Sequence, residues 1–414
     1  MLRYVRLNNN VENVIKQQAE ICIAIDVAKE CAIACCFDNA IRKVFDNFKF
    51  EYSKSGFHLL IDLFNKIEEK GLTYCVVFES TGVYHIPLKL FLIKHNITSF
   101  IINTKAIKGL RMICGRVKKT DDLDLKLLAE FYFNHSNLLI RMYQYDDYEL
   151  KELNRCYSFI LAENARLKRK FKTILSLIYP KIECIFPDLF LRHILVLLEK
   201  YPHPEIALSS EGIDMIDLLK NNSIHTELYC GKLIEKFKKY CLGLELIISK
   251  DSTYCVELSR YSKLLLENTE VLKTALDEIV QKARENENYE IINSIPGLGE
   301  NLTARLVAEL GDMSRFDNTS KLMAYAGLDP ITYQSGLKDG EHKCISKTGN
   351  ARLRGLLYIA CKGIIRLNYD NKITNFYKTK KLEGLNDKAA IVASMGKLLK
   401  VIYGMCKNGT MFES

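Results

Sequence analysis

A continuous heptad pattern in the middle of the chain constrains the fold more than any other feature. Between residues 150 and 178 the apolar side chains step alternately by three and four positions, and Pro180 ends the pattern. This spacing places them in one helical seam, as in a coiled coil, and the polar seam residue Asn164 can fix register and oligomeric state. An amphipathic helix packed within one chain is the alternative. The seam comprises Leu150, Leu153, Tyr157, Ile160, Asn164, Leu167, Phe171, Ile174 and Ile178.

The chain length and the sequence around this seam predict several structural units. At 414 residues the chain exceeds one typical domain. A second helical stretch is predicted over 252–288, and the intervening segment 181–251 carries no motif that we can assign. We therefore expect three parts, namely an α/β domain over 18–140, a helical coiled-coil linker over 145–288, and a mainly helical domain over 289–410.

The N-terminal part alternates short apolar runs with helical patterns. Three predicted strands in succession favour an antiparallel meander, and the later alternation of strands and helices favours parallel additions to the same sheet. Strands are predicted at 21–26, 31–37, 41–50, 73–78 and 97–102, with helices from Lys54 to Gly71, over 83–95 and over 121–132.

Composition points to a cytoplasmic protein with no membrane partner. The 14 cysteines include no CxxC pair, which is typical of reduced, small apolar residues in a cytosolic chain. No uninterrupted apolar run reaches the length of a membrane span. The net charge of +9 is a weak indication of a polyanionic partner. The clustering of positive residues is a more informative sign, because Arg116, Lys118 and Lys119 directly precede an acidic cluster.

That cluster opens the helix predicted over 121–132. On a helical wheel of about 100° per residue, Asp121 and Asp124 fall on the broad apolar face, whereas Asp122 falls on the polar side. Asp122 is explained as a solvated charge near the positive helix end, and either Asp121 or Thr120 can cap the helix. An unpaired carboxylate on an apolar face is costly, so we expect Asp124 to be protonated, paired or metal-bound.

Two further carboxylates lie at the ends of buried strands: Asp26 ends the first predicted strand, and Glu79 directly follows the fourth. Together with Asp121 and Asp124 they would form an oxygen-rich site suited to Mg²⁺. Two such ions a few ångströms apart can activate a nucleophile and stabilise a leaving oxygen in phosphoryl transfer. The sequence thus predicts a two-metal site assembled from two strands and a later helix.

The C-terminal part contains two glycine-rich stretches. Gly297 and Gly299 precede an amphipathic helix, as in a helix-hairpin-helix whose backbone N–H groups contact phosphates, and a plain glycine turn is the alternative. Further on, Lys347, Arg352 and Arg354 surround another glycine turn and open a helix. They suit phosphate contacts or a solvated helix face.

Several phrases resemble a known family. "IAIDVAKE", "VVFESTGVYH" and "GRVKKTDDLD" are similar to the three acidic motifs of DEDD insertion-sequence transposases, whose N-terminal domain is RuvC-like, with an RNase H fold. "IPGLGENLTARLVAELGD", "YAGLDPITYQSG" and "ISKTGNARLRGLL" resemble the C-terminal transposase domain of that family. The resemblance covers both ends of the chain in the family's order, and it matches the middle only as a helical, coiled-coil linker.

The resemblance implies an acidic tetrad of Asp26, Glu79, Asp121 and Asp124, and a catalytic serine at Ser335. It implies Mg²⁺-dependent DNA recombination through a serine–DNA covalent link. A structured noncoding RNA would pair with donor and target DNA. It also implies a homo-oligomer, a dimer or a tetramer in the synaptic complex, with one subunit's acidic domain meeting another's serine domain. The setting would be the cytoplasm of a prokaryote, in association with the nucleoid.

Alternatives remain at two levels. Asp122 could replace Asp121 in the tetrad, and Tyr333, Ser346 and Thr348 are rival nucleophiles near Ser335. At the level of function, the alternatives are a RuvC-like nuclease that hydrolyses DNA junctions without a covalent intermediate, and a decayed, non-catalytic nucleic-acid binder. The intact set of four carboxylates argues against the decayed form.

Overall fold

The computed structural model describes residues 19–102, 104–113, 120–135, 140–141, 145–330, 334–335, 338–339, 344–368 and 370–413. These residues divide into two compact units, residues 1–148 and 149–414. The first unit is a mixed α/β domain, and the second is almost entirely helical. This is the architecture that the sequence predicts, with an α/β part followed by helices.

The first unit is built on a six-stranded sheet with the order β3-β2-β1-β4-β5-β6. The first three strands pair antiparallel, β4 and β5 join in parallel, and β6 returns antiparallel. The predicted meander with parallel additions is therefore confirmed, and β6 is a strand that the sequence did not predict. The strands are β1 (Ile21–Val27), β2 (Cys31–Asp38), β3 (Lys43–Glu51), β4 (Tyr74–Glu79), β5 (Ser99–Ile102) and β6 (Ile140–Arg141).

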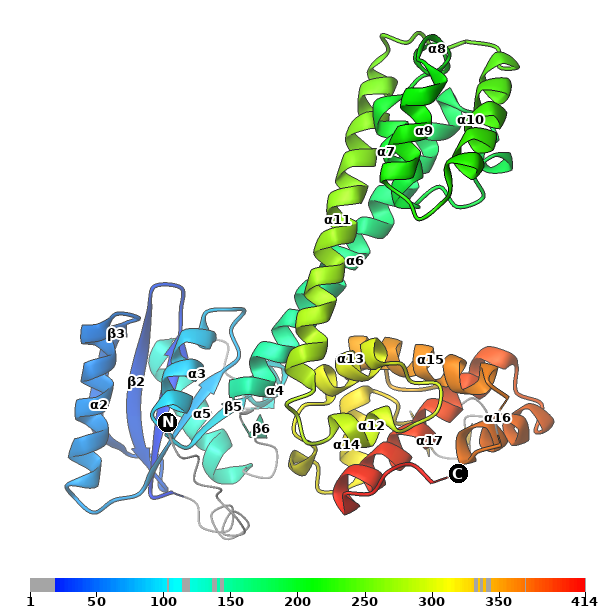
Figure 1. Cartoon of the computed structure of the whole chain (residues 1–414). Coiled ribbons are helices and arrows are strands. Elements are labelled where there is room, and N and C mark those ends of the chain that lie inside the picture. Colours follow the sequence, from blue (N-terminus) through cyan, green and yellow to red (C-terminus); the bar gives the residue numbers. More distant parts are fainter. Residues whose placement is uncertain are drawn as a thin grey trace. The chain divides into compact units, whose positions relative to one another are not determined.

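Helices cover both faces of this sheet (Figure 1). Because side chains alternate along a strand, Ile23 and Ile25 of β1 pack with α2 and α3, whereas Cys22 and Ala24 pack with α5. The uniformly apolar runs that predicted buried strands follow from this double coverage. The helices are α2 (Lys54–Glu68), α3 (His85–Lys94), α4 (Thr104–Ile113) and α5 (Asp121–Asn134).

Two long helices, α6 (Tyr145–Ile178) and α11 (Thr253–Ala283), run side by side (Figure 1). Every residue of the predicted heptad seam is buried or half-buried. The seam packs against α11 of the same chain, with Leu150 and Ile279 in one cluster and Phe171 and Leu265 in another. Packing within one chain, the alternative to a coiled coil between chains, therefore accounts for the seam.

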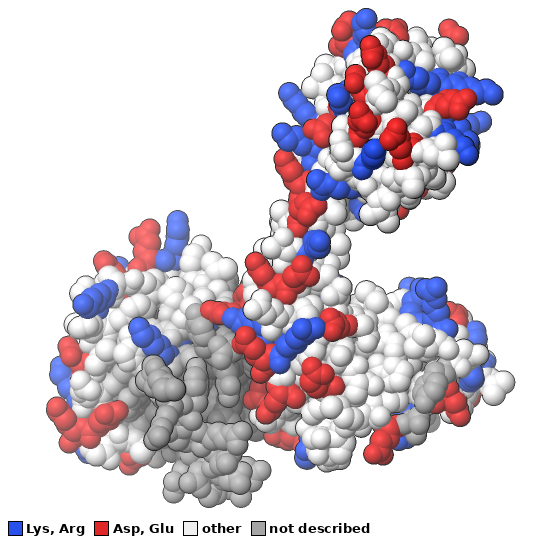
Figure 2. Space-filling model, in the orientation of Figure 1, with Lys and Arg blue, Asp and Glu red and all other residues white. Residues whose placement is uncertain are grey.

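The segment 181–251, which the sequence left unassigned, forms a small helical bundle at one end of α6 and α11 (Figure 1). Its core contains Tyr179, Leu198 and Phe237 together with α6 and α11 side chains. Figure 2 shows positive and negative side chains intermingled on the visible face of this bundle. The elements are η2 (Ile182–Cys184), α7 (Arg192–Lys200), α8 (Pro204–Ser209), α9 (Gly212–Asn221) and α10 (Glu227–Leu242).

The C-terminal helices share one core with the opposite ends of α6 and α11. Tyr157 and Ile279 of these long helices lie in the same cluster as Leu306, Leu357 and Leu398. The elements are α12 (Tyr289–Asn293), α13 (Glu300–Leu310), η3 (Met313–Arg315), α14 (Thr319–Ala326), β7 (Gln334–Ser335), β8 (Lys338–Asp339), α15 (Ala351–Arg366), α16 (Lys372–Leu382) and α17 (Asp387–Asn408).

Helix α17 is long and apolar enough to cross a membrane by length and composition, with half of its most apolar window buried. Lysines 397 and 400 interrupt it, which agrees with the absence of an uninterrupted apolar run in the sequence. Its Met395, Leu399 and Ile402 belong to the core of the second unit. A core helix of a soluble protein has the same properties, so α17 is weak evidence for a membrane span.

Candidate functional site

Asp26 and Glu79 lie at the ends of neighbouring parallel strands. The last paired residues of β1 and β4 are Ile25 and Phe78, so the two carboxylates occupy the next position on each strand. The alternation of side chains puts both on the sheet face that α5 covers. Both residues are half-buried. Asp26 and Glu79 therefore lie at adjacent positions on one face of the sheet, and their joint role as metal ligands stays a prediction.

The first turn of α5 carries the other carboxylates toward this face. Thr120 caps the helix, and its hydroxyl oxygen accepts a hydrogen bond from the Leu123 N–H at 3.4 Å. Asp124 is 9% exposed, as predicted for a carboxylate on the apolar face. Asp121, which shares that face on the helical wheel, is exposed, and its role as a metal ligand stays a prediction. Sharing a helical stripe with the buried Asp124 is therefore not enough to bury Asp121.

Each of the two other acidic positions of this turn has a cationic partner. Asp124 forms an ion pair with Arg111 of α4. Asp122 accepts hydrogen bonds from Lys43, at 3.1 Å, and from Asn47, both on β3. The hydrogen bond from Lys43 is the main cause that lowers the pKa of the Asp122 carboxyl. The Asp122 side chain is exposed, as predicted, but it is tied to β3 rather than only to water.

An open hollow lies beside the start of α5. Asp121 lines it together with Ile33 of β2, which pairs directly with Asp26 across the sheet. The other lining residues are Asn47, Phe48, Lys49, Thr120 and Asp122. The exposed Asp121 carboxylate therefore faces a solvent-accessible space next to the strand that carries Asp26.

The donor chemistry of this site fits a hard divalent cation. Asp26, Glu79, Asp121 and Asp124 offer carboxylate oxygens alone, which are the ligands that Mg²⁺ prefers. Within the described part of the chain, no three His, Cys, Asp or Glu side chains lie close enough together to hold a metal ion. The Arg111 guanidinium engages one oxygen of the Asp124 carboxylate, so a metal ion at this carboxylate would compete with Arg111 for its charge.

The predicted nucleic-acid contacts are described only in part. Arg116, Lys118 and Lys119 lie outside the described residues. Lys347 and Arg352 are exposed and free to meet a phosphate backbone. Arg354 instead donates to the Ala326 and Gly349 carbonyls at 2.9 and 3.1 Å, so its guanidinium has a structural role.

The predicted glycine hairpin joins α12 and α13. Gly297 has a φ of +92°, and a Cβ there would lie 3.0 Å from the Ile364 Cα of α15. Conformation and close packing thus explain this glycine without a nucleic acid. Gly299 precedes the first turn of α13, and a Cβ there would meet open space. Phosphate binding by this turn stays a prediction.

Ser335 ends β7 and pairs with Lys338 of β8 in a two-stranded hairpin. Of the rival nucleophiles, Tyr333 lies outside the described residues. Ser346 donates to an Asp329 carboxylate oxygen at 2.5 Å, and Thr348 donates to Ser346 at 3.2 Å. These bonds engage both hydroxyls in the loop that carries the hairpin.

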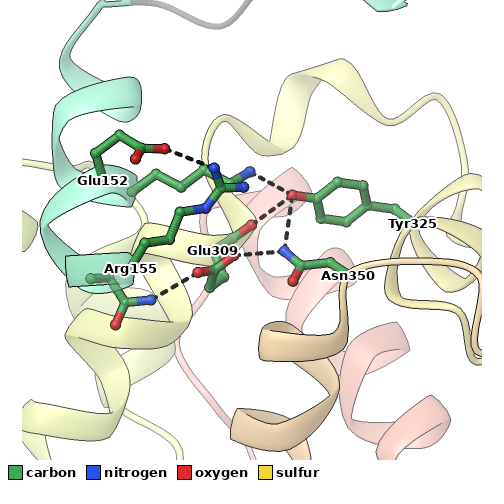
Figure 3. Close-up of polar contacts among 7 residues, drawn as sticks. Glu152, Arg155, Glu309, Tyr325 and Asn350 are labelled. Atoms are coloured by element: carbon green, nitrogen blue, oxygen red, sulfur yellow. Dashed lines mark hydrogen bonds and ion pairs between the residues drawn. The ribbon is translucent and has the colours of Figure 1, made fainter. Parts of the chain in front are cut away.

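Sequence reasoning missed a buried polar network in the second unit (Figure 3). Glu309 of α13 is completely buried, and its carboxylate accepts hydrogen bonds from Asn154, at 2.9 Å, and Asn350, at 2.6 Å. The Tyr325 hydroxyl donates to the Glu309 carbonyl at 3.0 Å and accepts from Lys151 at 2.8 Å. A lone glutamate inside the apolar run "ARLVAEL" was the available signal.

Comparison with known proteins gives matches at both ends of the chain. Residues 23–180 match the family model of a DEDD transposase of IS110 type, and residues 289–378 match that of the transposase family IS116/IS110/IS902. The first match includes all four predicted acidic residues, and the second includes Ser335. The two matched regions lie in the order that the sequence motifs predicted.

Individual relatives agree with these matches. An insertion element IS116 uncharacterized 44.8 kDa protein from Streptomyces clavuligerus is 25% identical over 61% of this chain and 62% of its own length. An IS110 uncharacterized 43.6 kDa protein from Streptomyces coelicolor is 22% identical over 72% of both chains. A pilin gene-inverting protein from Moraxella bovis is 29% identical over 31% of this chain and 39% of its own. The chain thus spans less than two thirds of the first of these relatives.

Proposed function

Because the chain belongs to the DEDD transposase family of insertion sequences, we propose that it catalyses Mg²⁺-dependent cleavage and exchange of DNA strands through a serine–DNA covalent intermediate. The observation that carries the proposal is the arrangement of the first unit. Two carboxylates end adjacent parallel strands, Asp26 and Glu79, on the face where α5 presents the buried Asp124. The strand order and pairing of this sheet support a RuvC-like, RNase H-type fold.

Asp26, Glu79, Asp121 and Asp124 would hold the metal, which when bound neutralises the scissile phosphate as a Lewis acid. The Ser335 oxygen attacks the phosphorus of that phosphate. A new bond forms between the serine oxygen and phosphorus, and the bond between phosphorus and the leaving sugar oxygen breaks. The serine proton passes to solvent, and the leaving oxygen takes up a proton. Attack by the released hydroxyl of another strand on the phosphoserine would complete the exchange.

The proposed partners are duplex DNA, as donor and target, and a structured guide RNA. The exposed Lys347 and Arg352, which follow the serine hairpin in the sequence, would contact phosphates, as would Arg116, Lys118 and Lys119, which precede the acidic helix in the sequence. The relative named as a pilin gene-inverting protein supports recombination of DNA as the reaction class. We propose that the active enzyme is a cytoplasmic homo-oligomer in which the acidic domain and the serine domain of different subunits meet.

The test is a covalent-adduct assay with labelled donor and target DNA, a guide RNA transcribed from the flanking element, and Mg²⁺. Wild-type protein is expected to form a DNA adduct that survives denaturing electrophoresis. Ser335→Ala should form none, because it lacks the attacking oxygen. Asp124→Asn should lose adducts because the metal loses a charged ligand. Asp122→Asn is the matched control, since its carboxylate is exposed and bound to Lys43.

Different outcomes separate the candidate functions. Adducts that persist in Ser335→Ala would remove the serine from its role. Mg²⁺-dependent DNA hydrolysis without any adduct would favour the alternative, a RuvC-like nuclease that acts on DNA junctions. That alternative is favoured by one observation, namely that all four carboxylates belong to the first unit and need no group from the second. If Asp122→Asn lost activity and a variant of Asp121 did not, Asp122 would replace Asp121 as the member of the tetrad.

A further inference from the structure

Two described stretches of the second unit, 325–330 and 344–350, flank the segment that carries Ser335 and are here called the neck. The Lys347 N–H donates to the Gly327 carbonyl at 3.1 Å, and the Ser346 N–H donates to the Asp329 carbonyl at 2.9 Å. Pro330 and Ile345 form a bridge beyond them. The serine hairpin lies between these two stretches in the sequence, so the neck holds the chain on both sides of the segment that contains it.

The two stretches of the neck are in direct backbone contact. Gly327 has a φ of +65°, and a Cβ on Gly349 would lie 2.3 Å from its nitrogen. Arg354 holds the contact from α15, because its guanidinium donates to one carbonyl in each stretch. A side chain at either glycine would force the stretches apart, so their spacing is set by the sequence.

The buried network lies at the base of the neck and holds both stretches (Figure 3). Tyr325 belongs to the first stretch and Asn350 to the second. The Asn350 N–H donates to the Tyr325 carbonyl at 2.7 Å, and its side-chain amide donates to Glu309 and, at 3.3 Å, to the Tyr325 hydroxyl. Through Asn154 and Lys151 the same network reaches α6. Two helices, α6 and α13, thereby anchor both ends of the loop.

Stability alone does not require a charge at this position. Replacing a buried ionic group by apolar residues of similar volume is often neutral or stabilising. A fully hydrogen-bonded network does, however, restrict its members to one geometry, which apolar packing does less strictly. Glu309 is completely buried, and two side-chain amides satisfy its carboxylate. The network is therefore suited to positioning.

We propose that Glu309, Tyr325 and Asn350 are positioning residues that fix the neck and thereby place Ser335 for attack on the DNA. This inference rests on the proposed function of Ser335. None of the three residues has to contact the substrate. Their contribution is the fixed spacing of the neck, because a nucleophile misplaced by about 1 Å loses much of its rate.

The first experiment measures hydrogen–deuterium exchange and adduct formation on the full-length chain. Tyr325→Phe removes one hydroxyl and keeps the ring. We expect the neck amides of Ser346, Lys347 and Asn350 to exchange about tenfold faster or more, because the hydroxyl that bonds to Glu309, Lys151 and Asn350 is lost, and adduct formation to slow by at least as much. Tyr179→Phe is the matched control, since it also removes a buried phenol bond to a carbonyl, at 2.8 Å from the Tyr201 oxygen.

The second experiment exchanges donor and acceptor across one bond. Asn350→Asp places two carboxylates against each other, and Glu309→Gln removes the charge that Asn350 meets. The double variant restores the bond in the opposite direction, because the introduced glutamine amide can donate to the introduced aspartate, which can still cap α15. We expect both single variants to slow adduct formation about tenfold or more and the double variant to recover most of the loss.

The proposal would be overturned if Tyr325→Phe and Tyr179→Phe showed the same rates of neck amide exchange and of adduct formation. It would also be overturned if the double variant formed adducts no faster than the single variants. A role limited to global stability would change exchange throughout the second unit and would show no rescue by the reversed bond. If wild-type protein forms no adduct while Tyr325→Phe still frees the neck, the proposed function of Ser335 fails and the assignment of the network to the neck stands.

Discussion

The Tyr325 phenol is expected to lose its proton well below the usual pH for tyrosine. Burial raises its pKa, but the nearby cations Lys151 and Arg315 outweigh this effect and lower the pKa to about 8. The Lys151 ammonium lies 2.8 Å from the hydroxyl oxygen, and the Arg315 guanidinium lies 4.4 Å from the ring centroid. The perturbation that tests this is Tyr325→Phe, which removes the ionisable group and leaves the ring between the cations.

The lowered pKa gives a definite change of stability with pH. Tyrosine in the unfolded chain titrates near pH 10, so a folded-state pKa of about 8 for Tyr325 corresponds to roughly 2–3 kcal/mol of free energy of unfolding. Between these values the unfolded state binds more protons, so the contribution of Tyr325 to the free energy of unfolding increases with pH. It is complete above pH 10 and is lost as the pH falls through 8. The deficit of Tyr325→Phe, meaning its loss of unfolding free energy relative to wild type, should therefore widen by up to ~2–3 kcal/mol between pH 8 and 10.

Two measurements follow the same group. A difference absorbance titration of wild type against Tyr325→Phe should show one phenolate appearing near pH 8. Lys151→Met should move that titration toward higher pH, because it removes one of the two cations. Urea unfolding of both proteins at a series of pH values should show the widening deficit. A shared background from cysteines and lysines cancels in the difference.

Tyr179 supplies a control of opposite sign. Burial raises its pKa above the ordinary value for tyrosine, so Tyr179→Phe should show no gain in deficit between pH 8 and 10. The reasoning is refuted if the phenolate missing from Tyr325→Phe appears with the bulk of the tyrosines near pH 10. It is also refuted if Lys151→Met leaves the titration unchanged.

Two further predictions concern the acidic site and the long helix pair. Arg111→Gln should lower the free energy of unfolding by ~1–3 kcal/mol in EDTA, because Asp124 is left buried without its cationic partner. Adding Mg²⁺ should then raise the melting temperature of this variant by more than that of wild type. Equal shifts in the two proteins would contradict competition between Arg111 and the metal. Asn164→Leu should stabilise the second unit by ~1–3 kcal/mol in urea unfolding, since the Asn164 side-chain oxygen is buried without a hydrogen-bond partner among the described residues. A loss of stability in this variant would contradict the reasoning.

Local patterns in the sequence were sufficient to predict most of the first unit. Buried strands and amphipathic helices depend on neighbours within a few residues, so β1, β4 and α5 follow from periodicity. The burial of Asp124 also follows, because apolar residues flank it on the same face. The exposure of Asp121 did not follow, because the helical angle alone does not tell which residues of a first turn are covered by the rest of the domain.

Partners far apart in the sequence were beyond such reasoning. The Asp122 carboxylate meets Lys43 and Asn47, which precede it by 79 and 75 residues. Glu309 meets Asn154 across 155 residues. Hydrogen bonds of this kind leave no periodic signal, because only the tertiary fold brings their members together. A buried charge inside an apolar run is the one local sign that a distant partner must exist.

In the proposed reaction, very different structures have to hold the metal ligands and the serine nucleophile in place. Metal ligands and a nucleophile both have to be held in place closely, since misplacement costs rate. Asp26 and Glu79 obtain this from paired strands in the interior of a sheet, where backbone hydrogen bonds fix their spacing. Ser335 belongs to a two-residue strand in a hairpin, which has no such neighbours beyond β8 among the described residues. In the proposed role, the buried network of Glu309, Tyr325 and Asn350 at the base of the neck supplies the restraint that a sheet would otherwise give, which gives a reason for a carboxylate in a core that apolar residues could also fill.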